Sequence, residues 1–421
     1  HFFGATPFYN GVATQSLRFD DGGSAYLSRT FSSDVDNDKK MTISVWVKRG
    51  NISNATQVIV SNYTGVRFLG ELSWRSDDKI VFRPGGLGDG SSNSYSVQTT
   101  AQFRDPHSWY HLVLAYDSTQ STDTDRVELY VNGTEQTLEP LSGSHSFPPI
   151  NYAHEFSYNG ANNAIGYYTN FDSNYLDGYI SEFNFIDGLT LDQNSFGETK
   201  NGVWIAKEYT GSYGTNGYRL EFKNTSVGSG SSSTIGADTS GNNHHWTSTN
   251  VTASDCNMPD SPENNFATWS PLFTGGEQSA NTTGVTLSEG NLQVSVPTNE
   301  FVGSTFRPTS GKWYVEIRVK TIGSTNGEID WGWIQATTYS GTSGHSGQAN
   351  KWGVYYHAYS TDHIRLYDET SQLGSNINLT ISAGNILQLA WDIDNGKGWV
   401  GINNTYYAAD NGTDGNPSAG T

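Results

Sequence analysis

The chain of 421 residues contains one cysteine, Cys256, and two methionines. A single cysteine excludes an intrachain disulfide framework, because Cys256 has no partner within the chain. The sequence has no run of about 18 apolar residues, which excludes a membrane-spanning helix. Charged residues are also scarce: they make up 15% of this chain, against roughly 25% of a typical soluble chain.

The charge that is present is mainly acidic. The chain has 42 Asp and Glu residues against 23 Lys and Arg residues, which gives a formal net charge of −19. Nucleic-acid binding depends on Lys and Arg side chains that contact phosphates, so we expect no nucleic-acid partner. The same field repels anionic bilayers, and we expect no membrane insertion. Uncharged glycans, or cations that bridge to acidic surfaces, remain as partner classes.

Short segments alternate between apolar and polar residues, with the period of a β-strand. Residues 43–48 are an example, since Ile43, Val45 and Val47 share one face and Ser44, Trp46 and Lys48 share the other. Residues 312–320 follow the same rule, with Trp313, Val315, Ile317 and Val319 on one face. Turn dipeptides such as Asn132-Gly133 follow these segments. Helical periodicity is nearly absent, apart from one turn expected near residues 191–196 that Asp192 could cap.

This pattern predicts an all-β protein built from antiparallel β-sandwiches. We predict an N-terminal arm at residues 1–15 and a first sandwich at residues 16–201. Residues 202–282 are rich in Gly, Ser and Pro and predict a bridge, in which residues 218–222 alternate like a strand that docks on a domain. A second sandwich is expected at residues 283–421.

Four segments of the first half resemble a known family. They are TISVWVKRG at 42–50, WYHLVLAY at 109–116, VELYVNG at 127–133 and LDGYISEFNFIDGLT at 176–190. Their order and spacing resemble the laminin-G-like, concanavalin-type sandwich of the jelly-roll class. The second half, with SGKWYVEIRV at 310–319 and LQLAWDIDNGKGWVGIN at 387–403, is similar to a SPRY-like sandwich. The resemblances therefore imply two concanavalin-like sandwiches joined by the Gly/Ser-rich bridge.

Further segments resemble a module found in virion proteins of marine tailed phages of the cyanophage type. They are SLRFDDGGSAYLSRTFSS at 16–33, GVWIAKEYTGSYGTNGYRLEF at 202–222, DTSGNNHHWTSTN at 238–250 and ENNFATWSPL at 263–272. The resemblance implies a tail fibre, appendage or capsid-surface component that lies on the virion surface and contacts other virion proteins. It further implies a homo-oligomer that presents carbohydrate-binding sandwiches to a host cell-surface glycan. A purely structural decoration protein without a ligand, a surface adhesin and a concanavalin-fold glycan-degrading enzyme are the alternatives.

Catalytic residues are not apparent in the sequence. Laminarinases of concanavalin fold carry two Glu residues around an Asp on one strand, and Glu328-Ile329-Asp330 resembles the start of that motif. The positions due for the second Glu are Gly332 and Trp333, so the carboxylate pair that glycoside hydrolysis requires is incomplete. We therefore predict that the chain is not an enzyme. His244-His245 does not predict a zinc site, because adjacent strand residues face opposite ways and zinc needs three or four convergent ligands.

Calcium is the cation that the sequence favours. Asp34, Asp36 and Asp38 alternate in a loop before a predicted strand, as oxygen ligands can where a loop wraps a cation. Two other sets are alternatives: Asp172, Asn174 and Asp177, or Asp117, Asp123 and Asp125. The competing interpretation is a set of solvated turns, in which Asp and Asn are common.

Glycan binding requires an exposed aromatic ring against the apolar face of a sugar, with polar side chains at its edge. Three segments combine these features, and their candidate residues are Trp74, Arg75, Tyr167, Tyr168, Asp172, Asn174, Tyr175, Trp352, Tyr355 and Tyr356. The competing interpretation places these rings in the sandwich cores, where most Trp and Tyr side chains of such folds lie.

Overall fold

The computed structural model describes most of the chain. The described residues are 8–52, 55–63, 68–85, 95–141, 146–169, 173–276, 284–297, 300–323, 329–334, 351–357, 362–368, 371–407 and 415–420. The chain divides into two compact units. The first unit consists of residues 1–273, 286–295 and 303–305, and the second of residues 274–285, 296–302 and 306–421.

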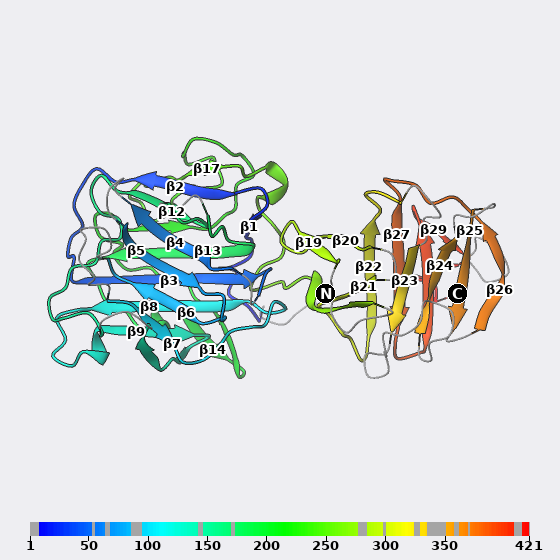
Figure 1. Ribbon diagram of the computed structural model, residues 1–421, viewed down its shortest axis with the longest axis horizontal. Helices are drawn as coiled ribbons and strands as arrows, with labels where there is room; N and C mark the ends of the chain where they lie inside the picture. The colour runs from blue at the N-terminus through cyan, green and yellow to red at the C-terminus, as the bar shows by residue number, and fades with distance from the viewer. Residues whose placement is uncertain are drawn as a thin grey trace. The chain divides into compact units, whose positions relative to one another are not determined.

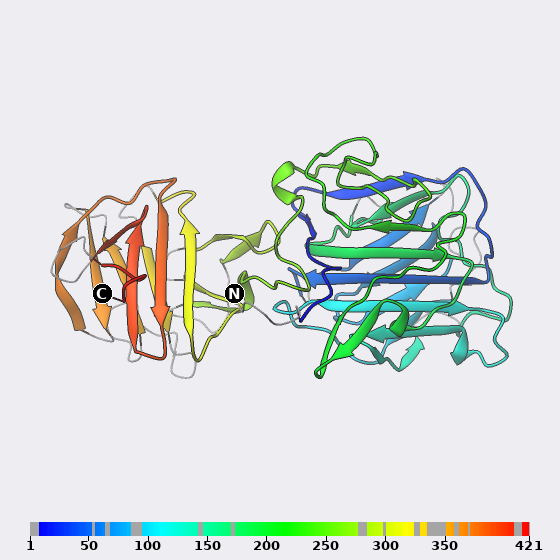
Figure 2. The same ribbon diagram turned by 180° about the vertical axis from the view of Figure 1, so that it is seen from behind.

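The first unit contains two large antiparallel sheets (Figure 1). The first sheet has the order β1 (Leu17–Phe19), β13 (Gly178–Asp187), β3 (Lys40–Arg49), β8 (Tyr110–Asp117), β9 (Val127–Val131) and β10 (Thr134–Glu135), and β16 (Tyr218–Leu220) also pairs with β13. The second sheet has the order β11 (Leu138–Pro140), β7 (Val97–Thr99), β6 (Ile80–Arg83), β5 (Phe68–Trp74), β4 (Gln57–Tyr63), β12 (Asn162–Ile165), β2 (Tyr26–Thr30) and β17 (Thr247–Thr249). Figure 2 shows the same two layers from behind.

The core lies between the two sheets. Ile43, Val45 and Val47 of β3 are fully buried in one cluster with Leu27 of β2 and Leu72 of β5. The alternation predicted for residues 43–48 therefore identifies the inward face of β3. Burying a side chain of this size contributes roughly 1.5–3 kcal/mol, which explains why these positions are apolar.

The outward face of β3 is buried as well. Trp46 and Lys48 are almost inaccessible, although strand parity places them opposite the core. A smaller cluster covers this face, in which Trp46 packs with Trp109, Tyr179 and Val12. The cover includes the hairpin of β14 (Gly197–Lys200) and β15 (Val203–Ala206), which precedes the last strands of this unit. This layer of loops and hairpin forms the candidate site described below.

The predicted bridge at residues 202–282 does not stand apart from the sandwich. Its residues up to Phe273 belong to the first unit, to which the bridge contributes β16 and β17. β16 lies inside residues 218–222, the segment whose alternation predicted a docked strand.

The second unit also has two sheets. One has the order β22 (Lys312–Arg318), β27 (Ile386–Asp392), β28 (Lys397–Ile402) and β29 (Thr405–Tyr407), and the other has the order β23 (Ile329–Ile334), β24 (Lys351–His357), β25 (His363–Asp368) and β26 (Ser371–Asn378). Ile364 and Leu366 from one sheet share a core with Leu387 and Leu389 from the other. Two short ladders lie outside these sheets: β19 (Thr286–Ser288) pairs with β20 (Gln293–Ser295) in the first unit, and β18 (Trp269–Gly276) pairs with β21 (Glu300–Ser304).

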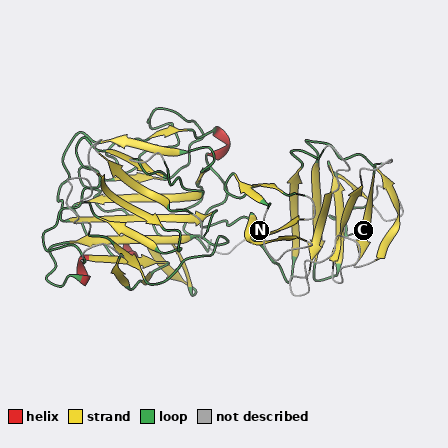
Figure 3. Cartoon of the chain, viewed as in Figure 1, coloured by secondary structure: helices red, strands yellow, loops and turns green. Residues whose placement is uncertain are grey.

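Helix is confined to single 3₁₀ turns in the part of the chain that the structure describes (Figure 3). They are η1 (Thr124–Arg126), η2 (Gln193–Ser195) and η3 (Ala253–Asp255). η2 follows Asp192, at the place where the sequence predicted one turn. None of these described helices is long and apolar enough to span a membrane. The prediction of an all-β fold with antiparallel sandwiches is confirmed.

Candidate functional site

Three of the aromatic residues predicted to contact glycans are buried. Trp74 is inaccessible in the main core, where the Arg49 guanidinium lies 5.1 Å from its ring centroid. Tyr168 packs on Val58, and Tyr356 belongs to the core of the second unit. None of these three rings offers an open face, which departs from our prediction: Trp74 and Tyr356 lie in the two cores, and Tyr168 is buried in a separate contact with Val58. Arg75 is half-buried at the end of β5.

The structure brings two other predicted residues together. Tyr167 and Tyr175 stack with ring centroids 4.8 Å apart, and Tyr26, which the sequence analysis missed, stacks on Tyr167 at 4.7 Å. The backbone carbonyl of Asn174 accepts a hydrogen bond from the Val58 N–H. Asp172 lies outside the described residues, and the side chains of Trp352 and Tyr355 are also outside the described part of the structure.

The predicted calcium loop has other partners. The Asp36 carboxylate accepts a hydrogen bond from the Thr215 N–H at 2.8 Å, and the Asp38 carboxylate pairs with Lys39 at 2.6 Å. Among the described residues, Asp34, Asp36 and Asp38 do not form a group whose carboxylate oxygens converge.

The described residues also bear on the weaker motifs. His244 contacts the Arg29 guanidinium, and His245 accepts a hydrogen bond from the Asp238 N–H, so the two rings have different partners. Glu328 and the side chain of Asp330 lie outside the described residues. The absence of catalysis therefore stays a prediction.

A cavity of about 420 Å³ lies over the outward face of the first sheet. Four aromatic side chains line it: Tyr9, Trp46, Trp109 and Trp204. Polar side chains of Ser108, Asn132 and Asn265 complete its edge. We call these seven residues the aromatic pocket. Its volume lies in the range of roughly 300–1,000 Å³ that is usual for sites of small molecules.

Distant parts of the chain build this pocket. Trp46 comes from β3 and Trp109 precedes β8, and the pairing of these strands brings the two indoles to one end of the sheet. Trp204 comes from the β14–β15 hairpin. Gly133 has a φ of +78°, and a Cβ at this position would lie 2.5 Å from the Trp204 ring. The Asn132-Gly133 turn therefore provides both a polar edge and the space that the indole needs.

A buried histidine supports the floor of the pocket. The His111 ring stacks on Trp46, with centroids 4.5 Å apart and planes inclined by 11°. Its Nδ1 accepts a hydrogen bond from the Trp204 Nε1–H at 2.9 Å, and its Nε2 lies 2.9 Å from the Ser44 Oγ. Complete burial lowers the pKa of His111 to about 3. The imidazole is therefore neutral near pH 7, with Nε2 carrying the proton that the Ser44 oxygen accepts.

The remaining polar contacts fix the pocket walls. Trp109 donates its Nε1–H to Asp260 at 3.1 Å, and Asp260 also pairs with Lys48 at 2.8 Å. Asn132 uses its side-chain oxygen to accept the His111 backbone N–H at 2.7 Å. These bonds hold the rings in place, so the pocket is preorganised.

Tyr9 belongs to the N-terminal arm, which a single carboxylate holds against the sandwich. Glu263 accepts backbone N–H bonds from Gly11 at 3.1 Å, Val12 at 2.8 Å and Ala13 at 3.2 Å. Three donors converging on one carboxylate fix the path of the arm, and therefore the wall that Tyr9 forms.

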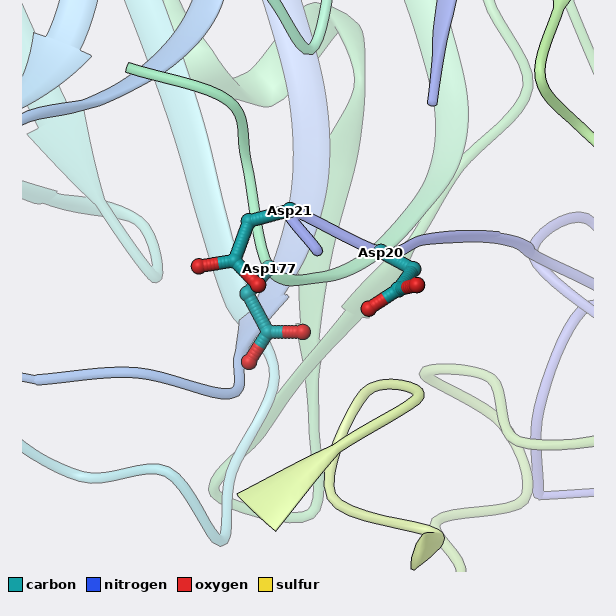
Figure 4. A group of neighbouring side chains, drawn as sticks. All are labelled: Asp20, Asp21 and Asp177. Atoms are coloured by element: carbon teal, nitrogen blue, oxygen red, sulfur yellow. The ribbon is translucent and has the colours of Figure 1, made fainter. Parts of the chain in front are cut away.

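A second candidate site lies at the end of β1. Figure 4 shows Asp20 and Asp21, which follow β1, beside Asp177, which precedes β13. One ligand oxygen from each carboxylate lies within 4.8 Å of the others, and we call these three residues the acidic cluster. Strand pairing of Phe19 with Gly178 brings them together.

The acidic cluster is electrostatically unfavourable as it stands. Asp177 is 1% exposed and accepts one N–H bond, from Gly290 at 3.3 Å. Its burial, followed by the charges of Asp21 and Asp20, raises its pKa to about 8. None of the ion pairs formed by the described residues includes these three carboxylates.

A set of hard oxygen donors suits Ca²⁺, so these residues could hold that cation. Asp177 was in one of our alternative sets, whereas Asp20 and Asp21 were missed.

A comparison with protein families identifies the first sandwich. Residues 21–194 match the laminin-G-type model of the concanavalin A-like lectin/glucanase superfamily. These residues therefore have the fold of a concanavalin A-like domain. The resemblance predicted for the first half is therefore confirmed, whereas the SPRY-like and phage-module resemblances stay predictions. No curated protein matches the chain.

Several solved structures are similar to this chain. A Bacteroides ovatus protein assigned to carbohydrate binding is 15% identical, with a TM-score of 0.37, and the match covers 57% of this chain and 59% of that one. The CBM40 of the Ruminococcus gnavus IT-sialidase, bound to α2,3-sialyllactose, is 14% identical with a TM-score of 0.27, covering 40% and 87%. Tailspike protein 2 of Escherichia coli O157:H7 bacteriophage CAB120 is 10% identical with a TM-score of 0.29, covering 43% and 23%. Similarities at this level assign no ligand to this chain.

Proposed function

We propose that the first unit is a glycan-binding module and that the chain binds carbohydrate without cleaving it. The observation that carries this proposal is the aromatic pocket, in which three tryptophans and a tyrosine surround one cavity with amide and hydroxyl groups at its edge. Sugars present apolar C–H faces to aromatic rings and hydroxyl groups to polar edges, so this combination suits them. The concanavalin A-like domain supports the proposal, because a rigid sandwich holds such a site in position.

We further propose that the chain acts on the surface of a virion, as a fibre, appendage or capsid component that attaches to a host glycan. This setting is supported by the sequence segments that resemble phage virion modules, including residues 202–222 and 238–250. A single pocket of this size binds weakly, and many copies on one particle would raise the avidity through effective concentration.

The test is binding of the purified full chain to an array of cell-surface and storage polysaccharides. We expect binding that Trp204→Ala abolishes and that Trp313→Ala leaves intact. Trp313 is a suitable control because it is 38% exposed and lies on β22 of the second unit. A chain that binds no polysaccharide would contradict the proposal and favour a purely structural role. Release of oligosaccharides from any of these substrates would contradict the absence of cleavage.

A further inference from the structure

We propose that the aromatic pocket accepts an uncharged sugar ring and rejects sugars that carry carboxylate, sulfate or phosphate groups. This inference rests on the proposed function, because it names the ligand class of the same pocket. Two features of the pocket carry this inference. Several of its hydrogen-bonding groups already have partners within the chain, and the charge around the pocket is negative.

The indoles offer ring surface rather than hydrogen bonds. The N–H of Trp204 is donated to His111 and that of Trp109 to Asp260. Trp46, stacked on His111, is 5% exposed and Trp109 is 7% exposed, so only a small part of each ring borders the cavity. The half-buried Trp204 and Tyr9 provide most of the open ring surface. Rings held in this way provide apolar contact, which suits the C–H face of a sugar.

The lysine that contacts the pocket residue Asn265 is not available to a ligand. Lys48 is 1% exposed, and its ammonium group donates to Asp260, to the side-chain oxygen of Asn265 and to the backbone of Phe266, each at 2.8 Å. Its charge is therefore paired beneath the wall. Lys200, near the arm, lies 5.9 Å from the Phe8 ring centroid and is not part of the pocket lining.

Three carboxylates among the described residues also contact the pocket or the arm. Asp105 accepts the Ser108 hydroxyl at 2.7 Å, Asp260 accepts the Trp109 indole, and Glu263 holds the arm that carries Tyr9. The whole chain adds a net charge of −19. Among the described residues, an anionic sugar would find no unpaired cation in the pocket lining to replace its hydration, and it would meet charge of its own sign.

The free polar groups at the edge are neutral. The side-chain oxygen of Asn132 is engaged, whereas its amide nitrogen has no partner among the described residues. Ser108 donates to Asp105, so its oxygen can accept from a ligand. Together they provide an amide donor group and a hydroxyl acceptor, which match the hydroxyl groups of a sugar.

An aromatic cavity near carboxylates could also suit an organic cation such as choline. Two observations favour the sugar. The Asp260 carboxylate is already paired with Lys48, and Asp105, which accepts the Ser108 hydroxyl, is not part of the pocket lining. The amide of Asn132 matches a hydroxyl oxygen and has no match on a quaternary ammonium group.

The experiment measures binding of the full chain to neutral oligosaccharides, to sialylated and sulfated forms of the same oligosaccharides, and to choline. Asn132→Asp is the decisive variant, because the new carboxylate keeps the oxygen that accepts the His111 N–H but replaces the amide donor with a negative charge. Trp204→Ala removes one wall, and Trp313→Ala is the matched control. We expect binding of neutral forms only, with a loss of about tenfold or more in Asn132→Asp, which corresponds to one hydrogen bond. Binding should change little between about 50 and 500 mM NaCl, since no ion pair is involved.

Four results would overturn the inference. Sialylated or sulfated forms that bind with the same dependence on Trp204 would leave the proposed function intact but contradict the ligand class. Displacement of the sugar by millimolar choline would assign the pocket to a cation. Neutral binding that both pocket variants retain would place the glycan site elsewhere on the chain. Failure to bind any glycan would remove the proposed function together with the inference.

Discussion

The indole of Trp204 donates a hydrogen bond of 2.9 Å to Nδ1 of His111, so a residue of the covering hairpin is tied to the outward face of the first sheet. His111 in turn stacks on Trp46 and contacts Ser44 of β3. The bond therefore links the β14–β15 hairpin to two strands of the sandwich. Trp204 lines the aromatic pocket and His111 supports the pocket floor. The stability of the covering layer and the shape of the pocket therefore depend on the same hydrogen bond.

Replacing Trp204 by Phe should separate ring packing from this hydrogen bond. The variant keeps an aromatic wall but leaves the buried Nδ1 of His111 without a donor, which costs about 1–3 kcal/mol. We expect a lower free energy of unfolding in urea, with glycan binding weakened less than in Trp204→Ala. Trp313→Phe should leave the free energy of unfolding nearly unchanged, because Trp313 is partly exposed and donates to a local carbonyl. Equal stability of Trp204→Phe and the wild type would show that the bond contributes nothing.

His111 also predicts a pH dependence of stability. Its pKa is about 3 in the folded chain and near 6.5 when unfolded, so the unfolded state binds the proton first as pH falls. Above pH 6.5 the neutral ring makes its full contribution to the free energy of unfolding. This contribution is lost progressively as the pH falls from 6.5 to 3, by an amount on the order of a few kcal/mol. Thermal melts of His111→Gln should show a shallower loss over this window than the wild type. The same melts of His154→Gln provide the comparison with a second buried histidine, because burial lowers the pKa of His154 to about 4. An unchanged slope in His111→Gln would contradict the assignment of a neutral buried ring.

Strand periodicity allowed much of the fold to be predicted. Alternation in residues 43–48 identifies the core face of β3, because apolar burial selects every second residue. The same rule should have placed Trp74 inside, since it lies two residues after Leu72 and both are fully buried. The adjacent Arg75 gives Trp74 the local pattern of a ring with a polar edge, but strand parity outweighs that pattern. Trp313 is the converse case, because it shares a face with Val315 and Ile317 and is nevertheless 38% exposed.

The two candidate sites could not be predicted from local patterns. The aromatic pocket joins Tyr9, Trp46, Trp109 and Trp204, which meet only after β3 pairs with β8 and the hairpin docks. The acidic cluster likewise requires β1 to pair with β13, which brings Asp20 beside Asp177 across more than 150 residues of sequence. Pairing between distant strands is set by the whole core, so a window of neighbouring residues carries no signal of it.

Glu263 should control the N-terminal arm. Glu263→Ala removes the acceptor of three backbone N–H bonds, which we expect to cost about 1–3 kcal/mol and to expose the arm to proteases. Limited proteolysis with mass spectrometry should locate new cleavage around residues 8–13, and glycan affinity should fall because Tyr9 forms a pocket wall. Glu198→Ala is the control, since the exposed Glu198 accepts a single bond from Asn10 of the same arm. Cleavage at the same rate in both variants would show that Glu263 does not hold the arm.

The acidic cluster predicts a response to calcium that depends on Asp177. In a chelator, the Asp177 carboxyl keeps its proton up to a pH of about 8 when folded, against a usual value of 3.8. The unfolded state therefore binds fewer protons between these values, and stability falls as pH rises through them. Asp177→Asn removes this penalty, so at pH 8 in a chelator we expect the variant to melt at a higher temperature than the wild type.

Addition of Ca²⁺ should reverse that order. Ligand at about 100 times its dissociation constant stabilises a folded protein by roughly 2.7 kcal/mol, and the wild type should gain this while Asp177→Asn gains much less. Asp34→Asn is the matched control, because Asp34 lies in the loop that the sequence favoured and outside the acidic cluster. If the calcium response disappears in Asp34→Asn and persists in Asp177→Asn, the loop of Asp34, Asp36 and Asp38 is the site. If Ca²⁺ shifts the melting temperature of none of the three proteins, neither group binds the cation, and Asp177 is simply a buried acid that is protonated below pH 8.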